Sequence, residues 1–329
     1  MIAKRMPIIG PLPTNREEWL AARQKIITAT DMARIMAGEG FVVFAEKTGQ
    51  SEPFSGNKNT RRGKRFERPT LEEYADEANA FVCDGLPFLI DPDCPSLGAT
   101  PDAVAMQYTG DPSDEGAGRL GTVTPVNDWW PLGDPDSWGV EAKTSISADV
   151  AAQLAEGDDD SDFVPDAWMV QDQCQAAVCG WEVVDMAIFL FGRLRLRRVL
   201  RNDKLIDFYR TTAVEYAERI AKNLPPPINF DREACQSTIR SLYGSVDDSQ
   251  RIELSCDAVA AWNEYKRLGP EQTAIEKERK RLQSIVLAEL QNAGIGLSAG
   301  KPFLKRKIVQ RGSYEVSATS YPQLTAIKG

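Results

Sequence analysis

The order of predicted elements between residues 138 and 200 constrains the fold of this chain most strongly. Residues 138–145 are predicted to form a short strand, and residues 165–179 an amphipathic helix that ends before Gly180. Residues 183–191 and 194–200 are predicted to form an antiparallel hairpin. Strands that alternate with a helix in this way indicate a mixed α/β domain with a sheet flanked by helices.

Further elements are predicted on the N-terminal side. Two helices are expected within residues 16–37, one over 17–25 and one after Thr28-Ala29-Thr30. Residues 87–105 predict a strand, a turn and a strand, and residues 106–137, rich in Gly, Pro, Asp and Trp, predict a long insertion. Pro69 is expected either to kink its helix or to lie in the first turn.

A proline run divides the chain in two. Leu224-Pro225-Pro226-Pro227 follows a helix expected over residues 205–222 and predicts a domain boundary. We therefore expect a core of residues 1–224 and a helical and β-rich C-terminal appendage of residues 225–329. The appendage contains a charged helix over about 271–292 that is expected to pack on the core or between subunits. Its expected role is in oligomerisation or in a DNA channel.

Composition excludes whole classes of mechanism. The chain has no histidine, which excludes Ser-His-Asp and Cys-His catalysis and histidine metal sites. Its net charge of −9 argues against a passive nucleic-acid coat, but not against an enzyme whose basic residues line one groove. The six cysteines show no CxxC pairing, and no apolar run approaches the length of roughly 18 residues that a membrane helix needs. We expect a cytoplasmic protein with reduced thiols.

Two short motifs carry the candidate chemistry. In Gly139-Val140-Glu141-Ala142-Lys143-Thr144, alternate side chains of a strand share a face, so Glu141 and Lys143 point one way. In Ala99-Thr100-Pro101-Asp102, Pro101 cannot donate to a sheet ladder and marks a strand edge or bend. If the flanking strands pair, Asp102 and Glu141 lie side by side. Two carboxylates and a lysine there bind a hard cation and position a water. A turn aspartate and a surface ion pair are the alternative interpretation.

Two predicted helices add polar groups. Gly63-Lys64-Arg65-Phe66-Glu67 supplies a carboxylate, and Gln171 and Gln175 lie one turn apart on the helix that follows the Glu-x-Lys motif. Each feature alone is more typical of a solvated helix face. Their order along the chain is more specific: Arg and Thr, then Glu, Pro-Asp, Glu-x-Lys and Gln.

That order resembles the YqaJ-type viral recombinase nucleases, the lambda exonuclease family within the PD-(D/E)xK nuclease superfamily. The matching stretches lie within residues 19–192 and are WLAARQKIITATDMARIMAG (19–38), RRGKRFERPTLEEY (61–74), LGATPDAV (97–104), GVEAKTS (139–145) and AWMVQDQCQAAVCG (167–180). The insertion between Asp102 and Glu141 departs from the family pattern.

The resemblance implies a PD-(D/E)xK restriction-endonuclease-like core, a sheet flanked by helices with the active site in a cleft. It also implies Mg²⁺-dependent, 5′-to-3′ degradation of double-stranded DNA, which leaves 3′ overhangs for phage-type homologous recombination. Two Mg²⁺ ions are expected, with Mn²⁺ as a substitute. Asp102, Glu141 and the main-chain carbonyl of Ala142 would bind the metal, and Glu67 would bind or support a second ion. The resemblance assigns Lys143 to orienting the attacking water.

The remaining residues implied by the resemblance concern the water and the DNA end. Gln171 would help to hold the water or the lysine, and Arg23 and Thr30 fall at the family's 5′-phosphate pocket. From the residues themselves, Thr30 is a good N-cap for a helix beginning at Asp31, and helix N-termini attract phosphate. An ordinary cap and a surface arginine explain them equally well.

Two basic stretches are predicted to line a DNA groove. They are residues 58–65 and residues 193–198, where arginines alternate with leucines and predict one apolar and one basic face. A solvated edge strand is the alternative for the second stretch.

Partners and other functions follow from the same resemblance. It implies double-stranded DNA ends as substrate, a ring-like homo-oligomer, a single-strand annealing protein as partner and, for a phage protein, the host cytoplasm. One alternative is a PD-(D/E)xK endonuclease or repair nuclease without end dependence, which needs no phosphate pocket. A second is a catalytically silent DNA-binding or assembly protein, against which the intact Asp102, Glu141 and Lys143 set counts.

Overall fold

The computed structural model describes residues 6–11, 15–52, 56–108, 120–122, 132, 134–155, 163–247 and 249–310. Most of the predicted insertion over residues 106–137 lies outside these residues. The chain forms two compact units, Met1–Tyr243 and Gly244–Gly329. The sequence placed a boundary after Leu224, but the first unit continues through the next helix, because Cys235 packs there against Phe41 and Val42.

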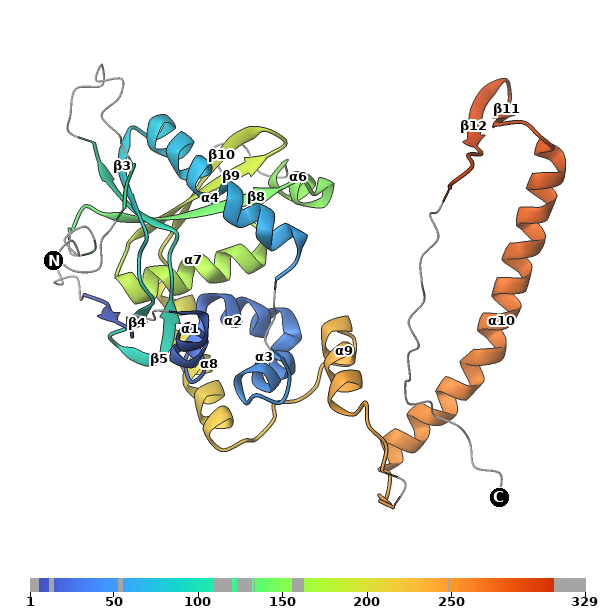
Figure 1. Ribbon diagram of the computed structural model, residues 1–329, viewed down its shortest axis with the longest axis horizontal. Helices are drawn as coiled ribbons and strands as arrows, with labels where there is room; N and C mark the ends of the chain where they lie inside the picture. Colours follow the sequence, from blue (N-terminus) through green and yellow to red (C-terminus); the bar gives the residue numbers. More distant parts are fainter. Residues whose placement is uncertain are drawn as a thin grey trace. The chain divides into compact units, whose positions relative to one another are not determined.

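The first unit is built on two sheets with helices around them (Figure 1). The larger sheet has the strand order β10-β9-β8-β6-β3-β7, and the smaller sheet has the order β1-β4-β5-β2. The strands are β1 Ile8–Ile9, β2 Ile27–Thr28, β3 Ala80–Asp84, β4 Leu89–Asp91, β5 Cys94–Ala99, β6 Ala103–Gln107, β7 Leu120–Thr122, β8 Trp138–Ser145, β9 Val183–Leu190 and β10 Arg193–Leu200.

The helices of the first unit follow the sequence pattern closely in the second half of the core. They are α1 Arg16–Arg23, α2 Ala29–Arg34, the π-helix η1 Ile35–Glu39, α3 Gly40–Lys47, α4 Lys58–Glu77, α6 Ala148–Ala155, α7 Asp166–Cys179, α8 Asp203–Ala221 and α9 Glu233–Leu242. Gly180 follows α7 with a φ of 68°, the left-handed conformation in which glycine commonly ends a helix. The predicted hairpin is confirmed, since β9 and β10 pair antiparallel over their whole length.

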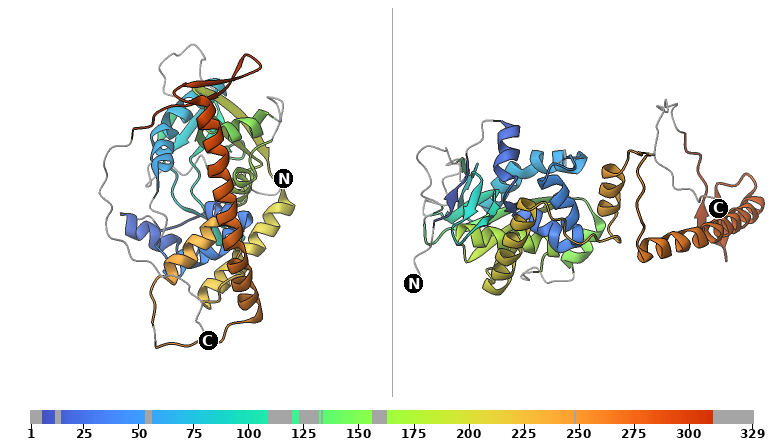
Figure 2. Two further views of the ribbon diagram at one scale, coloured as in Figure 1. Left: turned by 90° about the vertical axis from the view of Figure 1, so that its right-hand side faces the viewer. Right: turned by 90° about the horizontal axis from the view of Figure 1, so that it is seen from below.

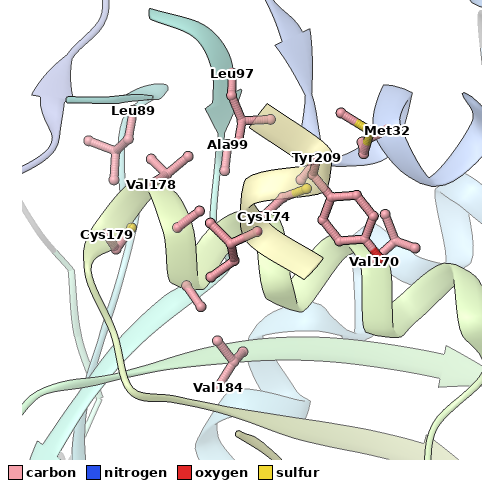
Figure 3. Close-up of a cluster of buried hydrophobic side chains, with 14 of the residues drawn as sticks. Met32, Leu89, Leu97, Ala99, Val170, Cys174, Val178, Cys179, Val184 and Tyr209 are labelled. Carbon is pink, nitrogen blue, oxygen red and sulfur yellow. The ribbon is translucent and has the colours of Figure 1, made fainter. Parts of the chain in front are cut away.

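α7 lies at the centre of the fold. It contacts strands of both sheets, and its side chains Val170, Cys174 and Val178 are buried with Leu97 of the smaller sheet and Val184 of the larger sheet (Figure 3). The opposite face of the larger sheet is covered by α4, whose Leu71, Tyr74 and Ala75 pack against Val82, Ala105, Val140 and Ala187. The expectation of a mixed α/β fold with helices on both faces of a sheet is therefore confirmed.

One helix start differs from the sequence-based expectation, and one of the two places expected for Pro69 is excluded. The second N-terminal helix begins at Ala29 and is capped by Thr28, so Thr30 is not its N-cap. Pro69 lies well inside α4, so it does not open that helix. At the start of α2, Thr28 and Asp31 form a reciprocal capping box, which satisfies more main-chain N–H groups than a single cap at Thr30 would.

The described residues of the second unit, 244–247 and 249–310, form one long helix and a hairpin (Figure 2). Helix α10 spans Cys256–Leu290, and the strands are β11 Ile295–Ser298 and β12 Lys301–Lys305. The helix begins earlier than the expected 271, because Ser255 caps it by accepting a hydrogen bond from the main-chain N–H of Ala258 at 3.2 Å. Among the described residues, no helix is long and apolar enough to cross a membrane.

Candidate active site

Asp102 lies in the short link between the two sheets. Its segment connects β5 of the smaller sheet to β6 of the larger sheet, and β6 pairs antiparallel with β8, with Ala103 opposite Val140. This register brings the Asp102 carboxylate to β8, where its Oδ2 accepts a hydrogen bond from the main-chain N–H of Ala142 at 2.9 Å. Burial, and then the nearby Glu141 carboxylate, raise the pKa of Asp102 well above its usual range.

Glu141 and Lys143 point from β8 toward α7. Lys143 Nζ donates to Glu141 Oε1 and, at 2.7 Å, to Gln171 Oε1. Gln175 Nε2 donates to the other Glu141 oxygen at 2.6 Å, so both oxygens of this buried carboxylate are engaged. Val140 and Ala142 belong to the cluster under α4, which confirms that the strand separates the two polar side chains from the apolar ones.

The charge of Lys143 is maintained by its neighbours. Burial alone would lower the pKa of its ammonium group, but the Glu141 and Asp102 carboxylates outweigh burial, so the pKa of Lys143 is raised. The side chain therefore stays protonated at neutral pH. A protonated lysine has three N–H donors, and the two bonds to Glu141 and Gln171 use two of them.

Glu67 stands within electrostatic reach of this group, on α4. Burial and then the charge of Glu141 raise the pKa of Glu67, and Lys64 opposes the rise. Among the described residues, however, no three carboxylate or thiol side chains surround a common point at metal-binding distance. The structure thus brings Asp102, Glu141, Lys143 and Gln171 into one bonded group, with Glu67 outside it.

The donor set fits a hard cation better than a soft one. The available ligands are carboxylate oxygens of Asp102, Glu141 and Glu67 and the main-chain carbonyl of Ala142, all of them oxygen. Burial, then the charges of Glu141 and Glu67, raise the pKa of Asp102, and a bound cation would relieve this repulsion. A third ligand would have to come from the main chain, from water or from a shift of the Glu67 side chain.

Arg23 and Thr30 have different neighbours in the fold. The exposed Thr30 accepts a long hydrogen bond, 3.4 Å, from Gln171 Nε2, which connects it to Lys143 through Gln171. Arg23, the last residue of α1, has its guanidinium 5.4 Å from the centre of the Phe88 ring. Burial lowers the pKa of Arg23, and the carboxylate of Asp31 partly offsets that effect.

The start of α2 already holds a carboxylate. Asp31 Oδ2 accepts hydrogen bonds from the main-chain N–H of Thr28 at 3.0 Å and from the Thr28 hydroxyl at 2.7 Å. Lys47 Nζ lies 2.7 Å from the same oxygen and neutralises it. Thr28 and Lys47 therefore engage Asp31, whereas the Thr30 hydroxyl accepts from Gln171.

Two polar residues of α7 were not assigned a role from the sequence. Gln175 was noted only as part of a polar helix face, whereas it holds Glu141. Asp172 is fully buried, and neither of its carboxylate oxygens has a hydrogen-bond partner within the described structure. Burial, and then Glu141, raise the pKa of Asp172 well above its usual range. The only sequence signal was an aspartate between the core-facing Val170 and Cys174.

The two basic stretches differ in how many side chains they expose. In α4, Lys58, Arg61, Lys64 and Arg65 are exposed within the two turns that precede Glu67. In β10, Arg193 and Arg195 are exposed on one side of the strand, and Arg198 is exposed on the other.

Of the other two β10 arginines, Arg197 is buried, and Arg198 stays exposed but bonds to a carboxylate of the neighbouring strand. Arg197 is buried and donates to the carbonyl of Leu154 at 3.2 Å. Arg198 makes two hydrogen bonds to Asp185, at 2.8 and 2.9 Å. The predicted apolar face is confirmed, since Leu194 and Leu196 pack under α4, while on the basic face Arg193 and Arg195 are exposed and Arg197 is buried.

Comparison with known proteins gives one family match. The sequence profile of the YqaJ-like viral recombinase domain matches residues 18–182, half of the chain, and this segment contains every candidate site residue. No curated protein matches the chain.

Several solved structures resemble the chain at low identity. An alkaline exonuclease from Laribacter hongkongensis is 20% identical with a TM-score of 0.47, over 63% of this chain and 94% of that one. The same enzyme in complex with dAMP is 19% identical with a TM-score of 0.48, over the same shares of the two chains. A phage-related exonuclease from Haemophilus somnus 129PT is 12% identical with a TM-score of 0.38, over 65% of this chain and 91% of that one. On the extent of the domain match, this chain belongs to the YqaJ-like viral recombinase domain family.

Proposed function

We propose that this chain is a metal-dependent nuclease with a PD-(D/E)xK active site, and that it degrades double-stranded DNA from a 5′ end to leave 3′ overhangs for recombination. The observation that carries the proposal is the bonded group on β8. Asp102 contacts the Ala142 N–H, and Glu141 is held between Lys143 and Gln175. Membership of a recombinase family is in accord with this proposal.

The charges of the group suit phosphodiester hydrolysis. A phosphodiester is anionic and repels an attacking hydroxide, so positive charge is needed where the negative charge develops. A bound Mg²⁺ or Mn²⁺ would supply charge neutralisation and a more acidic water. Asp102, Glu141 and the Ala142 carbonyl would hold the ion, with Glu67 as a further oxygen donor. No histidine is required, in keeping with its absence from the sequence.

Lys143 has a separate part in this proposal. Its two bonds to Glu141 and Gln171 fix the ammonium group in place and leave one N–H donor. That donor can orient a water toward the phosphorus or stabilise the charge on a phosphate oxygen. Gln171 keeps the lysine aimed, since its amide oxygen accepts from the lysine and its amide nitrogen faces Thr30.

The preference for a DNA end would come from the hydrogen bonds that link Thr30, Gln171 and Lys143. Thr30 is joined to Lys143 through Gln171, so a terminal phosphate bound beside Thr30 would lie close to the hydrolytic group. Arg23 would add a cation from α1, and the exposed Lys58, Arg61 and Lys64 of α4 would contact the DNA backbone.

A second candidate, an endonuclease without end dependence, is favoured by one observation. Asp31 places a carboxylate at the start of α2, where the terminal phosphate would bind, although Lys47 neutralises it. Digestion of end-labelled linear duplexes, with and without a 5′-phosphate, separates the two functions. The exonuclease degrades the phosphorylated duplex faster and spares covalently closed circles. Equal cutting of circular and linear DNA would establish the endonuclease instead.

A further inference from the structure

The hairpin of the second unit, residues 295–305, exposes an aromatic side chain at an irregular position. Gly296 pairs with Leu304 and Leu297 pairs with Pro302, so Phe303 is an extra residue of β12 without a cross-strand partner. Such β-bulges redirect the side chain of the extra residue. Phe303 is 76% exposed, although phenylalanine normally contributes to a core.

The hairpin does not need Phe303 to hold its shape. Leu304 and Leu290 of α10 both pack over Gly296, where an added Cβ would lie 3.0 and 3.2 Å from them. At the base of the hairpin, the Arg306 side chain donates to the Gln291 carbonyl at 2.6 Å, and its main-chain N–H donates to the Gly294 carbonyl at 2.8 Å. The aromatic ring is therefore free to serve a ligand.

The surroundings of Phe303 are basic. Residues 290–310 contain four basic residues, Lys301, Lys305, Arg306 and Lys307, and no acidic residue. The second unit, residues 244–329, has 13 basic and 10 acidic residues, whereas the whole chain has 39 and 48. The three lysines are exposed and form no hydrogen bond or ion pair with the described parts of the chain. They are available to an external anion.

We infer that this hairpin binds single-stranded DNA, with Phe303 stacking on a base and Lys301 and Lys305 contacting the phosphates on either side. Stacking needs an unpaired base, so an exposed aromatic ring between lysines favours a single strand over a duplex. Pairing of β12 with a β-strand of another protein is disfavoured, because Pro302 has no N–H to donate and the charged lysines oppose the addition of a strand at this edge. The choice of DNA over RNA rests on the proposed function. The family match ends at residue 182 and assigns nothing here.

The test uses the full chain in EDTA with a fluorescent, covalently closed circle of oligodeoxythymidine, followed by anisotropy. The circle has no end for the nuclease site to engage, and EDTA removes the divalent ions that the proposed cleavage requires. Phe303→Ala should weaken binding about tenfold, and Phe303→Trp, which can still stack, should restore it. Lys301→Ala with Lys305→Ala should reduce the salt slope of log K by about 0.7 for each phosphate that the protein no longer neutralises.

Two matched controls separate this hairpin from general exposure and charge. Ile308→Ala removes a side chain that is 91% exposed just beyond β12, and Lys277→Ala removes an exposed charge from α10. Both should bind the circle as the wild type does. Unchanged binding in Phe303→Ala overturns the inference, as does a loss in Ile308→Ala of the same size. If Phe303→Ala abolishes self-association and leaves DNA binding intact, the surface joins copies of the chain instead. The test measures binding and not cleavage, so its result is independent of nuclease activity. A chain without nuclease activity can still bind the circle through Phe303, and an active nuclease can bind it without Phe303.

Discussion

Replacing Asp102 by asparagine should separate its effect on metal binding from its effect on folding. The asparagine oxygen can still accept the hydrogen bond that Asp102 Oδ2 receives from the Ala142 N–H at 2.9 Å. The substitution removes a negative charge beside Glu141 and Glu67, whose charges raise the pKa of Asp102 after burial does. In EDTA, Asp102→Asn should therefore be at least as stable as the wild type.

Mg²⁺ should stabilise the two proteins to different extents. A ligand present at a hundred times its dissociation constant stabilises the folded state by about 2.7 kcal/mol. For a unit the size of residues 1–243, about 1 kcal/mol raises Tm by about 2–4 °C, which gives a rise of about 5–11 °C for the wild type. Asp102→Asn loses a charged ligand and should show well under half of that rise.

Differential scanning calorimetry in EDTA and across a Mg²⁺ series measures both effects. Asp207→Asn is the matched control, since it makes the same chemical change at an exposed position on α8, and it should respond to Mg²⁺ like the wild type. An equal rise in wild type and Asp102→Asn would refute the reasoning, because the ion would then be bound elsewhere. A marked loss of stability of Asp102→Asn in EDTA would also refute it.

Four further outcomes are expected. Lys143→Ala should lower the rate of DNA cleavage by about 10²–10⁴ while the protein stays folded by circular dichroism, since its ammonium is held by Glu141 and Gln171 at the site. Arg23→Ala should largely erase the preference for a 5′-phosphate, with end-dependent digestion slowed about tenfold to a hundredfold; an undiminished preference would remove Arg23 from the proposed pocket. Asp91→Ala should lower the free energy of unfolding, measured in urea, by about 3 kcal/mol, because the fully buried Asp91 accepts two hydrogen bonds from Arg210 at 2.7 and 3.0 Å. Asp93→Ala, which removes an exposed carboxylate 3.3 Å from the same arginine, should lower it by less than about 1 kcal/mol. Burial raises the pKa of Asp172, so the folded state favours the protonated carboxyl, and the wild type loses stability as pH rises above the unfolded pKa of about 3.9. Asp172→Asn should therefore be more stable than the wild type at pH 7 and lose that advantage near pH 4. Equal dependence of stability on pH in the two proteins would show that the carboxylate has a partner.

Local sequence determined the elements that carry the candidate site. The alternation around Glu141 and Lys143 places both on one face of β8, and the run that ends at Gly180 makes α7 a helix that stops there. The turn at Gly192 joins the two strands of the β9–β10 hairpin. These features depend on backbone geometry and on side chains a few residues apart, so they are present in the sequence pattern itself.

Tertiary structure decided which of these side chains meet. Asp102 reaches Ala142 only because β6 pairs with β8, across a sequence separation of 40 residues. The burial of Asp172 and Arg197, and the pairing of Arg198 with Asp185, depend on which face of each element is covered. Even the start of α2 was settled by competition between Thr28 and Thr30, which Asp31 and Lys47 resolved through contacts in the folded chain. Periodicity specifies a face, but only packing specifies what lies against it.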